Sequence, residues 1–181
     1  SEMCIRDRFG SMDVLCVDKT GTLTGDKITL EYYMDVLGNE CQYALDLAYL
    51  NSLYHTGVQN HLDDAILRYR EIPEQRTHYE ELERQHPKLD ELPFDHERRF
   101  ASVLTRHGEE NLLIIKGSVE EVYQKCSYIE HKGKRHKIDS HGHASVHTIV
   151  DEMLEDGMKV LAVAYKPLSQ ETCLLYTSPS P

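Results

Sequence analysis

The sequence predicts an α+β fold, in which an antiparallel sheet is flanked by helices and is preceded by one strand of an α/β domain. The first observation is an apolar run at residues 12–17 that ends in Asp18 and a small-residue segment, as buried strands of open α/β sheets do at their ligand-binding end. The second is a change near Pro87, from helical spacing before it to short apolar runs between turns after it. The later elements are therefore predicted to form a unit inserted after the first strand.

The part of this unit before Pro87 is predicted to be mainly helical. Segment 24–31 is polar and then alternating, and we expect a linker there. Apolar residues in 40–54 and in 61–70 recur at helical spacing, so both segments are predicted amphipathic helices. Segment 77–88 is strongly charged and is expected to be a solvated helix or loop.

The part after Pro87 has the pattern of an antiparallel meander with helices. Charged turns separate its apolar runs, and Ser118 is a plausible N-cap with two acidic residues after it. The predicted elements are strands at 89–94, 99–105 and 111–116, a helix at 118–126, a hairpin over 127–138, a helix at 147–155 and a strand at 159–165.

Composition limits the classes of function. The 181 residues carry a formal net charge of −11, which argues against nucleic-acid binding. Cys16, Cys41 and Cys126 lack metal-ligand spacing and suit a reducing cytosol. His141 and His143 lack a third ligand at motif spacing, so a solvated turn is expected there rather than a metal site. No apolar run approaches the roughly 18 residues that a membrane span needs.

The two ends of the chain are expected to be foreign to the protein. Residues 1–8 (SEMCIRDR) and 173–179 (CLLYTSP), in the final segment 173–181, can be encoded by complementary DNA strands, which two unrelated protein ends should not allow. Both strings resemble the transposase-inserted adapters used in DNA sequencing. We expect translated adapter sequence at both ends and exclude it from fold reasoning; the alternative is a natural tail without fixed structure.

Residues 18–24 (DKTGTLT) carry the chemistry that the sequence shows most clearly. A carboxylate such as Asp18 at the end of a buried strand can act as a nucleophile toward a phosphoryl group. Lys19 supplies a compact positive charge. Gly21 lets the backbone approach a phosphate, and the threonines offer hydroxyls and amides to its oxygens. The alternative is a strand followed by a polar turn and a helix cap.

This heptapeptide resembles the phosphorylation signature of P-type ion-pumping ATPases at every position. The resemblance implies that Asp18 attacks the γ-phosphate of ATP and becomes a phosphoaspartate. It also implies that Mg²⁺ bridges the Asp18 carboxylate, the Thr20 main-chain carbonyl and the phosphate, while Lys19 and Thr22 hold phosphate oxygens. Phosphatases of the wider haloacid dehalogenase superfamily have a second Asp where this chain has Thr20, a poor general base. That difference favours a pump over a phosphatase.

Two further segments resemble the nucleotide-binding domain of the same family. Residues 92–100 (LPFDHERRF) resemble its adenine-stacking segment, which implies that Phe94 packs on adenine and Arg99 lies near phosphate. His96 stands where many members have a basic residue. By itself, Phe94 would be read as a core residue.

The second segment is Ile115-Lys116-Gly117-Ser118, which resembles the family's Lys-Gly-Ala-Pro-Glu motif, with Ser118 and Val119 in place of Ala-Pro. The resemblance implies that Lys116 brings charge to the pocket and that Gly117 permits close approach of the nucleotide. The alternative is a strand end with a solvated lysine.

Asp63 and Lys159 occupy two more positions of the family pattern. Asp63 is expected to reach the amino edge of adenine, with a charged helix face as the alternative. Lys159 is expected to turn toward the phosphates of ATP, where many members have Arg; Lys keeps the charge but loses the bidentate fork.

The resemblance divides the chain and suggests the parent protein. Residues 9–26 would begin a haloacid-dehalogenase-like phosphorylation domain, 27–167 would form the nucleotide-binding domain, and 168–172 would begin the return linker. The chain looks most like bacterial magnesium-translocating pumps; calcium or proton pumps, or an ATP-binding module without turnover, are the alternatives. The parent is expected in the inner membrane with this segment on the cytoplasmic side. ATP and Mg²⁺ are the expected cofactors, and the cation, expected to be Mg²⁺, would pass through membrane helices outside this chain.

Overall fold

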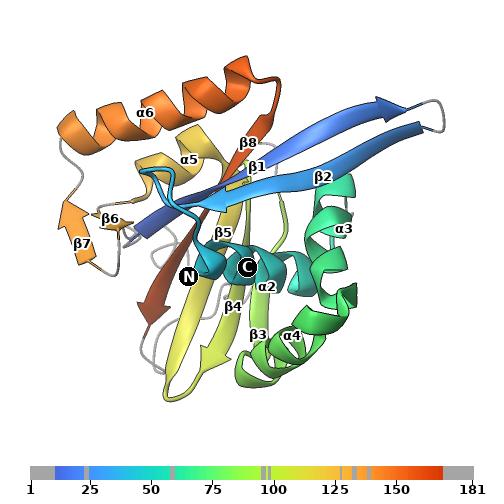
Figure 1. The fold of residues 1–181 in the computed structure, drawn as a ribbon. Helices are drawn as coiled ribbons and strands as arrows, with labels where there is room; N and C mark the ends of the chain where they lie inside the picture. The colour runs from blue at the N-terminus through green and yellow to red at the C-terminus, as the bar shows by residue number, and fades with distance from the viewer. Residues whose placement is uncertain are drawn as a thin grey trace.

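A six-stranded antiparallel sheet in the order β2-β1-β8-β5-β4-β3 forms the centre of the computed structural model of the chain (Figure 1). The structure describes residues 11–22, 25–57, 60–94, 97, 99–126, 128–131, 134–137 and 140–168. The sheet strands are β1 (Ser11–Thr22), β2 (Gly25–Met34), β3 (Lys88–Leu92), β4 (Phe100–His107), β5 (Glu110–Ser118) and β8 (Lys159–Leu168). A separate hairpin consists of β6 (Tyr128–His131) and β7 (Lys134–Lys137).

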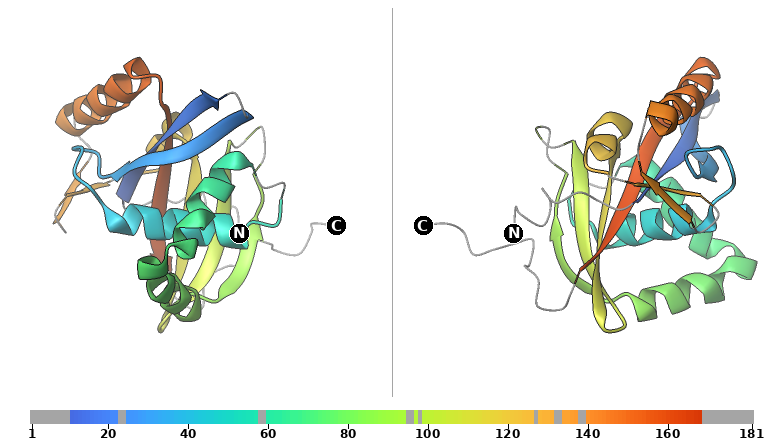
Figure 2. Two further views of the ribbon diagram at one scale, coloured as in Figure 1. Left: turned by 45° about the vertical axis from the view of Figure 1, so that its right-hand side comes forward. Right: turned by 90° about the vertical axis from the view of Figure 1, so that its left-hand side faces the viewer.

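Helices cover both faces of this sheet (Figures 1 and 2). They are α2 (Gln42–Tyr54), α3 (His61–Leu67), the 3-10 turn η1 (Arg68–Glu71), α4 (Pro73–Gln85), α5 (Val119–Gln124) and α6 (Ser140–Glu155). Residues of α2, α3 and α4 pack in one hydrophobic cluster, and residues of α5 and α6 pack in another. Successive residues of a strand point to opposite faces, so β5 gives Ile114 to the first cluster and Ile115 to the second.

The predicted fold class is confirmed in its main part, the antiparallel sheet with flanking helices. The predicted helices 40–54 and 61–70 correspond to α2 and to α3 with η1, and the charged segment 77–88 lies largely within α4, whose Tyr79 and Leu82 are buried. Ser118 caps α5, since its hydroxyl accepts a hydrogen bond from the Glu121 N–H at 3.4 Å. One helix is longer than predicted: α6 begins at Ser140, so His141 and His143 lie in a helix and not in a turn.

The first strand pairs within the same sheet, which the sequence did not predict. β1 pairs antiparallel with β8 and with β2, which occupies the segment expected to be a linker, and its membership in a haloacid-dehalogenase-like domain stays a prediction. The physical reason is its two-sided apolar pattern: Val14 and Cys16 enter the cluster of α5 and α6, while Leu15 and Val17 enter the cluster of α2. A strand that is apolar on both faces needs cover on both, and this sheet supplies it. The proposed boundary between residues 26 and 27 stays a prediction.

The far end of β1 leaves the body of the sheet. Pairing with β8 ends at Val17, opposite Lys159, whereas pairing with β2 continues to Thr22. Residues 18–22 therefore form a two-stranded ribbon with β2, which projects beyond the other strands in Figure 1. None of the described helices is long and apolar enough to cross a membrane.

Candidate functional site

A pocket of about 140 Å³ opens where the end of α2 and the start of α3 meet the central strands. Four of the six residues predicted to bind nucleotide line it together: Asp63 from α3, Phe94 from the segment after β3, and Lys116 and Gly117 from β5. The remaining lining residues are Asn51, His55, Asn60, Leu62, Ala101 and Leu161. Residues far apart in the sequence thus converge on one concave site.

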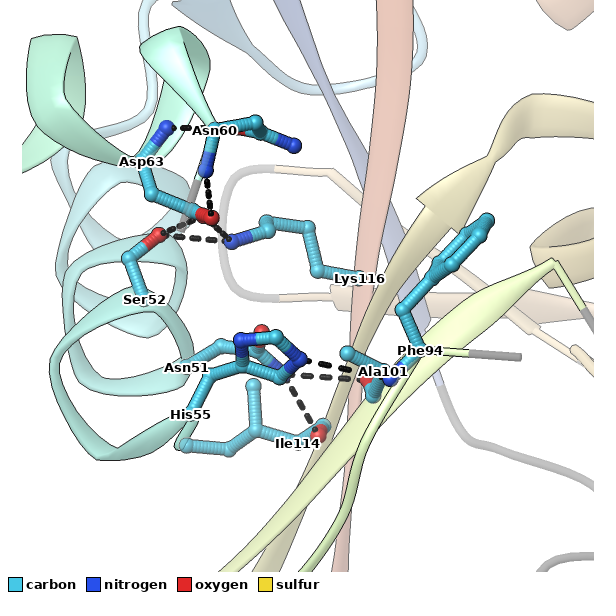
Figure 3. A network of polar contacts seen from close by, with 9 residues as sticks. All are labelled: Asn51, Ser52, His55, Asn60, Asp63, Phe94, Ala101, Ile114 and Lys116. Atoms are coloured by element: carbon cyan, nitrogen blue, oxygen red, sulfur yellow. Dashed lines mark hydrogen bonds and ion pairs between the residues drawn. The ribbon is translucent and has the colours of Figure 1, made fainter. Parts of the chain in front are cut away.

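A buried ion pair occupies one wall of the pocket (Figure 3). The Lys116 ammonium lies 2.7 Å from Oδ1 of Asp63 and donates to the Ser52 hydroxyl oxygen at 2.6 Å. The Ser52 hydroxyl in turn donates to the same carboxylate oxygen at 2.9 Å. Lys116 was expected to bring positive charge to the pocket, but this carboxylate neutralises that charge within the fold.

The capping box at the start of helix α3 holds Asp63 in position for the ion pair with Lys116. Asn60 and Asp63 form a capping box at the start of α3: the Asn60 side chain accepts from the Asp63 N–H at 2.9 Å, and Oδ2 of Asp63 accepts from the Asn60 N–H at 3.2 Å. Burial alone would raise the pKa of the Asp63 carboxyl, but the Lys116 charge and hydrogen bonds from Lys116, Ser52 and Asn60 outweigh it and lower the pKa. Asp63 is therefore held as a carboxylate.

Asn51 ties the pocket floor to helix α2. Its side-chain amide donates to the carbonyl oxygens of Ala101 in β4 and Ile114 in β5, both at 3.1 Å (Figure 3). The side chain is fully buried. Since buried polar groups are costly unless hydrogen-bonded, these bonds favour one position of the helix over the sheet.

Phe94 lies at the rim of the pocket and is 50% exposed. It is therefore not a core residue, which was the alternative reading of this position. Its main-chain N–H donates to Nε2 of His55 at 3.3 Å (Figure 3). A half-exposed aromatic ring beside a small pocket provides a flat apolar surface on which a planar group can stack.

Gly117 has a different structural reason from the one predicted. A Cβ at this position would lie 2.3 Å from the Arg99 carbonyl oxygen and 2.7 Å from the Phe100 Cα. The glycine thus allows the close approach of the neighbouring main chain, quite apart from any ligand. Arg99 itself has a positive φ of 59° and is exposed. Among the described residues it is not part of the pocket lining.

Lys159 lies close to the pocket along β8 but does not line it. It is exposed and pairs with Val17 of β1. Alternation along the strand puts it on the same face as Leu161, which is a lining residue. Lys159 is the next residue along β8 on that face.

The structure does not bring the phosphorylation signature to the pocket. Asp18 is half-buried in β1, and alternation places it on the face of Val14 and Cys16, opposite to the face that carries Lys116. Lys19, Thr20 and Thr22 continue the strand, where a turn was predicted. Leu23 and Thr24 lie outside the described residues, as does His96.

The predicted magnesium ligands are the Asp18 carboxylate and the Thr20 main-chain carbonyl. Within the part of the chain that the structure describes, no group of three or more His, Cys, Asp or Glu side chains could hold a metal ion. Mg²⁺ prefers six oxygen ligands in a near-octahedral arrangement. The described residues by themselves do not fit a resident magnesium centre.

Four polar residues of the site were not predicted from the sequence: Asn51, His55 and Asn60, which line the pocket, and Ser52, which bonds to Lys116 and Asp63 beside it. Asn60 could have been found, because an Asn three residues before an acidic residue at a helix start is a capping signature. Ser52 and His55 have no such local signal. Their roles depend on β5 and on the segment after β3 coming to lie against α2.

Comparison of the chain with known proteins identifies the family that it resembles. Residues 33–178 match the family model described as P-type ATPase, cytoplasmic domain N. The chain is 40% identical over 161 residues to the magnesium-transporting ATPase, P-type 1, of Escherichia coli K12, covering 88% of this chain and 18% of that protein.

Other relatives extend this picture. Identity is 39% over 161 residues with the protein of the same name from Salmonella typhimurium LT2, covering 88% of this chain and 17% of that one. It is 26% over 178 residues with calcium-transporting ATPase 1 of Bacillus cereus, covering 88% of this chain and 20% of that one. The chain spans about a fifth of the length of the curated relatives it matches.

Proposed function

The chain belongs to the P-type ATPase family, and we propose that its pocket binds ATP, with the base stacked on Phe94. The observation that carries the proposal is the convergence of Asp63, Phe94, Lys116 and Gly117 on one pocket. These residues come from three separate parts of the sequence, and the family pattern had assigned all four of them to nucleotide.

The pocket has the chemistry of a base site. A planar heterocycle would lie against the Phe94 ring, since aromatic and base faces stack favourably. Lys116 has bonds to Asp63 and Ser52, which leaves one of its three ammonium hydrogens for a ring nitrogen. Its charge is balanced inside the fold, so the wall beside the base is polar but close to neutral. Lys159 and Arg99 are proposed to face the phosphates from outside the pocket.

For the whole protein we propose an ATP-driven cation pump of the inner membrane that imports magnesium. The support is the higher identity to magnesium-transporting than to calcium-transporting relatives. This segment would lie on the cytoplasmic side. The cation would be bound by oxygen ligands of membrane helices in the rest of the pump.

The reaction would begin with attack by an Asp18 carboxylate oxygen on the γ-phosphorus of ATP, which forms the phosphoaspartate and breaks the bond to the β–γ bridging oxygen, so that ADP leaves. Mg²⁺ would arrive with ATP as part of the substrate and would neutralise the developing phosphate charge. Within this chain, Phe94, Asp63 and Lys116 would bind and orient the nucleotide, and Asp18 would supply the nucleophile. Because Asp18 lies on the face of the sheet opposite to the pocket, the chain alone is expected to bind ATP without turning it over.

Titration of ATP against the chain tests this function. Stacking on an aromatic side chain is worth about 1–3 kcal/mol per base, so Phe94→Ala is expected to weaken ATP binding by about 5- to 150-fold, whereas Phe94→Tyr keeps the affinity. Tyr32→Ala is the control, since Tyr32 is similarly exposed but lies on β2. Equal ATP affinity of the parent chain and of Phe94→Ala would contradict the assignment of Phe94 to the base. Release of phosphate from ATP by the chain alone would contradict the expectation that it binds ATP without turning it over.

A further inference from the structure

His55 connects the end of helix α2 to the segment that carries Phe94. It is the C-cap residue of α2, and its own N–H donates to the Asn51 carbonyl at 3.2 Å. The imidazole is 8% exposed, and its Nε2 accepts the Phe94 N–H at 3.3 Å. The histidine side chain thus provides a main-chain tether for Phe94 (Figure 3).

The chemistry of this bond determines the form of the imidazole. A peptide N–H can only donate, so Nε2 accepts this bond and the ring hydrogen lies on Nδ1. Nδ1 is buried and has no hydrogen-bond partner in the described part of the chain. The imidazole therefore acts here as a single acceptor that points at the Phe94 main chain.

The hydrogen bond to His55 falls at the start of the segment after β3. β3 ends at Leu92, and Pro93 has no N–H to donate. Phe94 carries the first main-chain donor after the strand, and half of its own surface is exposed. The buried imidazole is thus a defined anchor for a ring that the core does not enclose.

The neighbours of His55 hold the same segment. The Thr56 N–H donates to Oε2 of Glu91 in β3 at 2.8 Å, and the Thr56 hydroxyl also bonds to this carboxylate. The main chain at Gly57 passes so close to the imidazole that a Cβ there would lie 2.6 Å from its Cε1. The consecutive residues after α2 therefore bond to β3 and to Phe94, and they also restrict the position of the His55 ring.

We propose that His55 is a positioning residue for nucleotide binding: by accepting the Phe94 N–H it sets where the Phe94 ring meets the base. This inference rests on the proposed ATP site. A ring that must be ordered at the moment of binding weakens affinity, because its conformational entropy is lost then. His55, which also lines the pocket, raises affinity because the Phe94 ring is already ordered before the nucleotide binds.

The first test compares His55→Ala with His55→Gln in ATP titrations of the full chain. Glutamine places an acceptor oxygen close to the position of Nε2, whereas alanine places none. Loss of one ordinary hydrogen bond corresponds to about a fivefold change in affinity. We expect about fivefold weaker binding for His55→Ala, near-parental binding for His55→Gln, and no change for His147→Ala on α6.

A double variant separates this role from the proposed function. If His55 acts through the ring, His55→Ala has no further effect in a Phe94→Ala background. Additive losses would overturn the positioning role. If His55→Ala binds ATP as tightly as the parent chain while Phe94→Ala binds it more weakly, the positioning role is overturned but the proposed ATP site is not. Failure of the parent chain to bind ATP would overturn both.

A second measurement needs no nucleotide. Amide hydrogen exchange of Phe94, followed by NMR, is expected to accelerate severalfold in His55→Ala and to stay slow in His55→Gln. Gly57→Ala, which displaces the imidazole from the other side, is expected to accelerate it as well. Unchanged Phe94 exchange in a folded His55→Ala chain would show that no tether exists and would overturn the proposal.

Discussion

The ammonium of Lys116 lies 2.7 Å from Oδ1 of Asp63, and both side chains are more than nine-tenths buried. Lys116 comes from β5 and Asp63 from α3, so the pair joins the sheet to the helical layer beside the pocket. The contact therefore has two consequences, one for the stability of the fold and one for the charge that a ligand would meet.

Removal of one partner should destabilise the fold. Lys116→Met leaves a buried carboxylate without its cation, which costs about 3–5 kcal/mol in comparable sites. Urea unfolding measures this loss. The double variant Asp63→Leu with Lys116→Met should lose much less than the sum of the two single variants. Additive losses would show that the two side chains do not depend on each other.

The same pair predicts an acid dependence of stability. The pKa of Asp63 is lower in the folded chain than its unfolded value of about 3.9. The carboxylate thus contributes stability that is fully present above about pH 4 and is lost as the pH falls through the folded pKa. Asp63→Asn should flatten this part of the profile when urea midpoints are measured from pH 6 to pH 3.

The matched control for this titration is Asp64→Asn, because Asp64 is the exposed neighbour of Asp63 on α3. It should leave the acid arm of the profile unchanged. If both variants change the profile equally, the acid dependence does not come from the buried pair.

Gly117 should not tolerate a side chain. Gly117→Ala places a methyl group 2.3 Å from the Arg99 carbonyl oxygen, and overpacking of this kind typically costs about 1–3 kcal/mol. Gly108→Ala is a useful comparison, because a Cβ there meets nothing within 4 Å and only its φ of 62° is unfavourable. Thermal unfolding should show the larger loss for Gly117→Ala; the reverse order would contradict the close main-chain contact.

Asp18→Asn should leave ATP affinity unchanged in this chain. Asp18 is on the face of the sheet opposite to the pocket, in the ribbon that β1 forms with β2 beyond β8. Isothermal titration with ATP measures the effect, and Phe94→Ala serves as the variant that must respond. A change of more than about threefold with Asp18→Asn, about 0.6 kcal/mol, would place the carboxylate near the nucleotide.

Local sequence patterns were sufficient for most of the elements. Apolar residues at helical spacing located α2 and α3, and short runs between charged turns located β3, β4 and β5. α6 was predicted too short because its first half is polar and gives no periodic apolar signal. The pairing of β1 with β2 and β8 was not predicted, because an apolar strand can pair with any sheet that covers both of its faces.

The sequence by itself determined the phosphorylation signature at residues 18–24, the family, and four residues that share a pocket. Only the tertiary structure decided that Lys116 is neutralised by Asp63, that Gly117 makes room for the Arg99 main chain, that His55 holds Phe94, and that Asp18 does not line the pocket. The physical reason is distance along the chain. Contacts such as Lys116 with Asp63, which are 53 residues apart, depend on strand order and face, and no local pattern of residues specifies these.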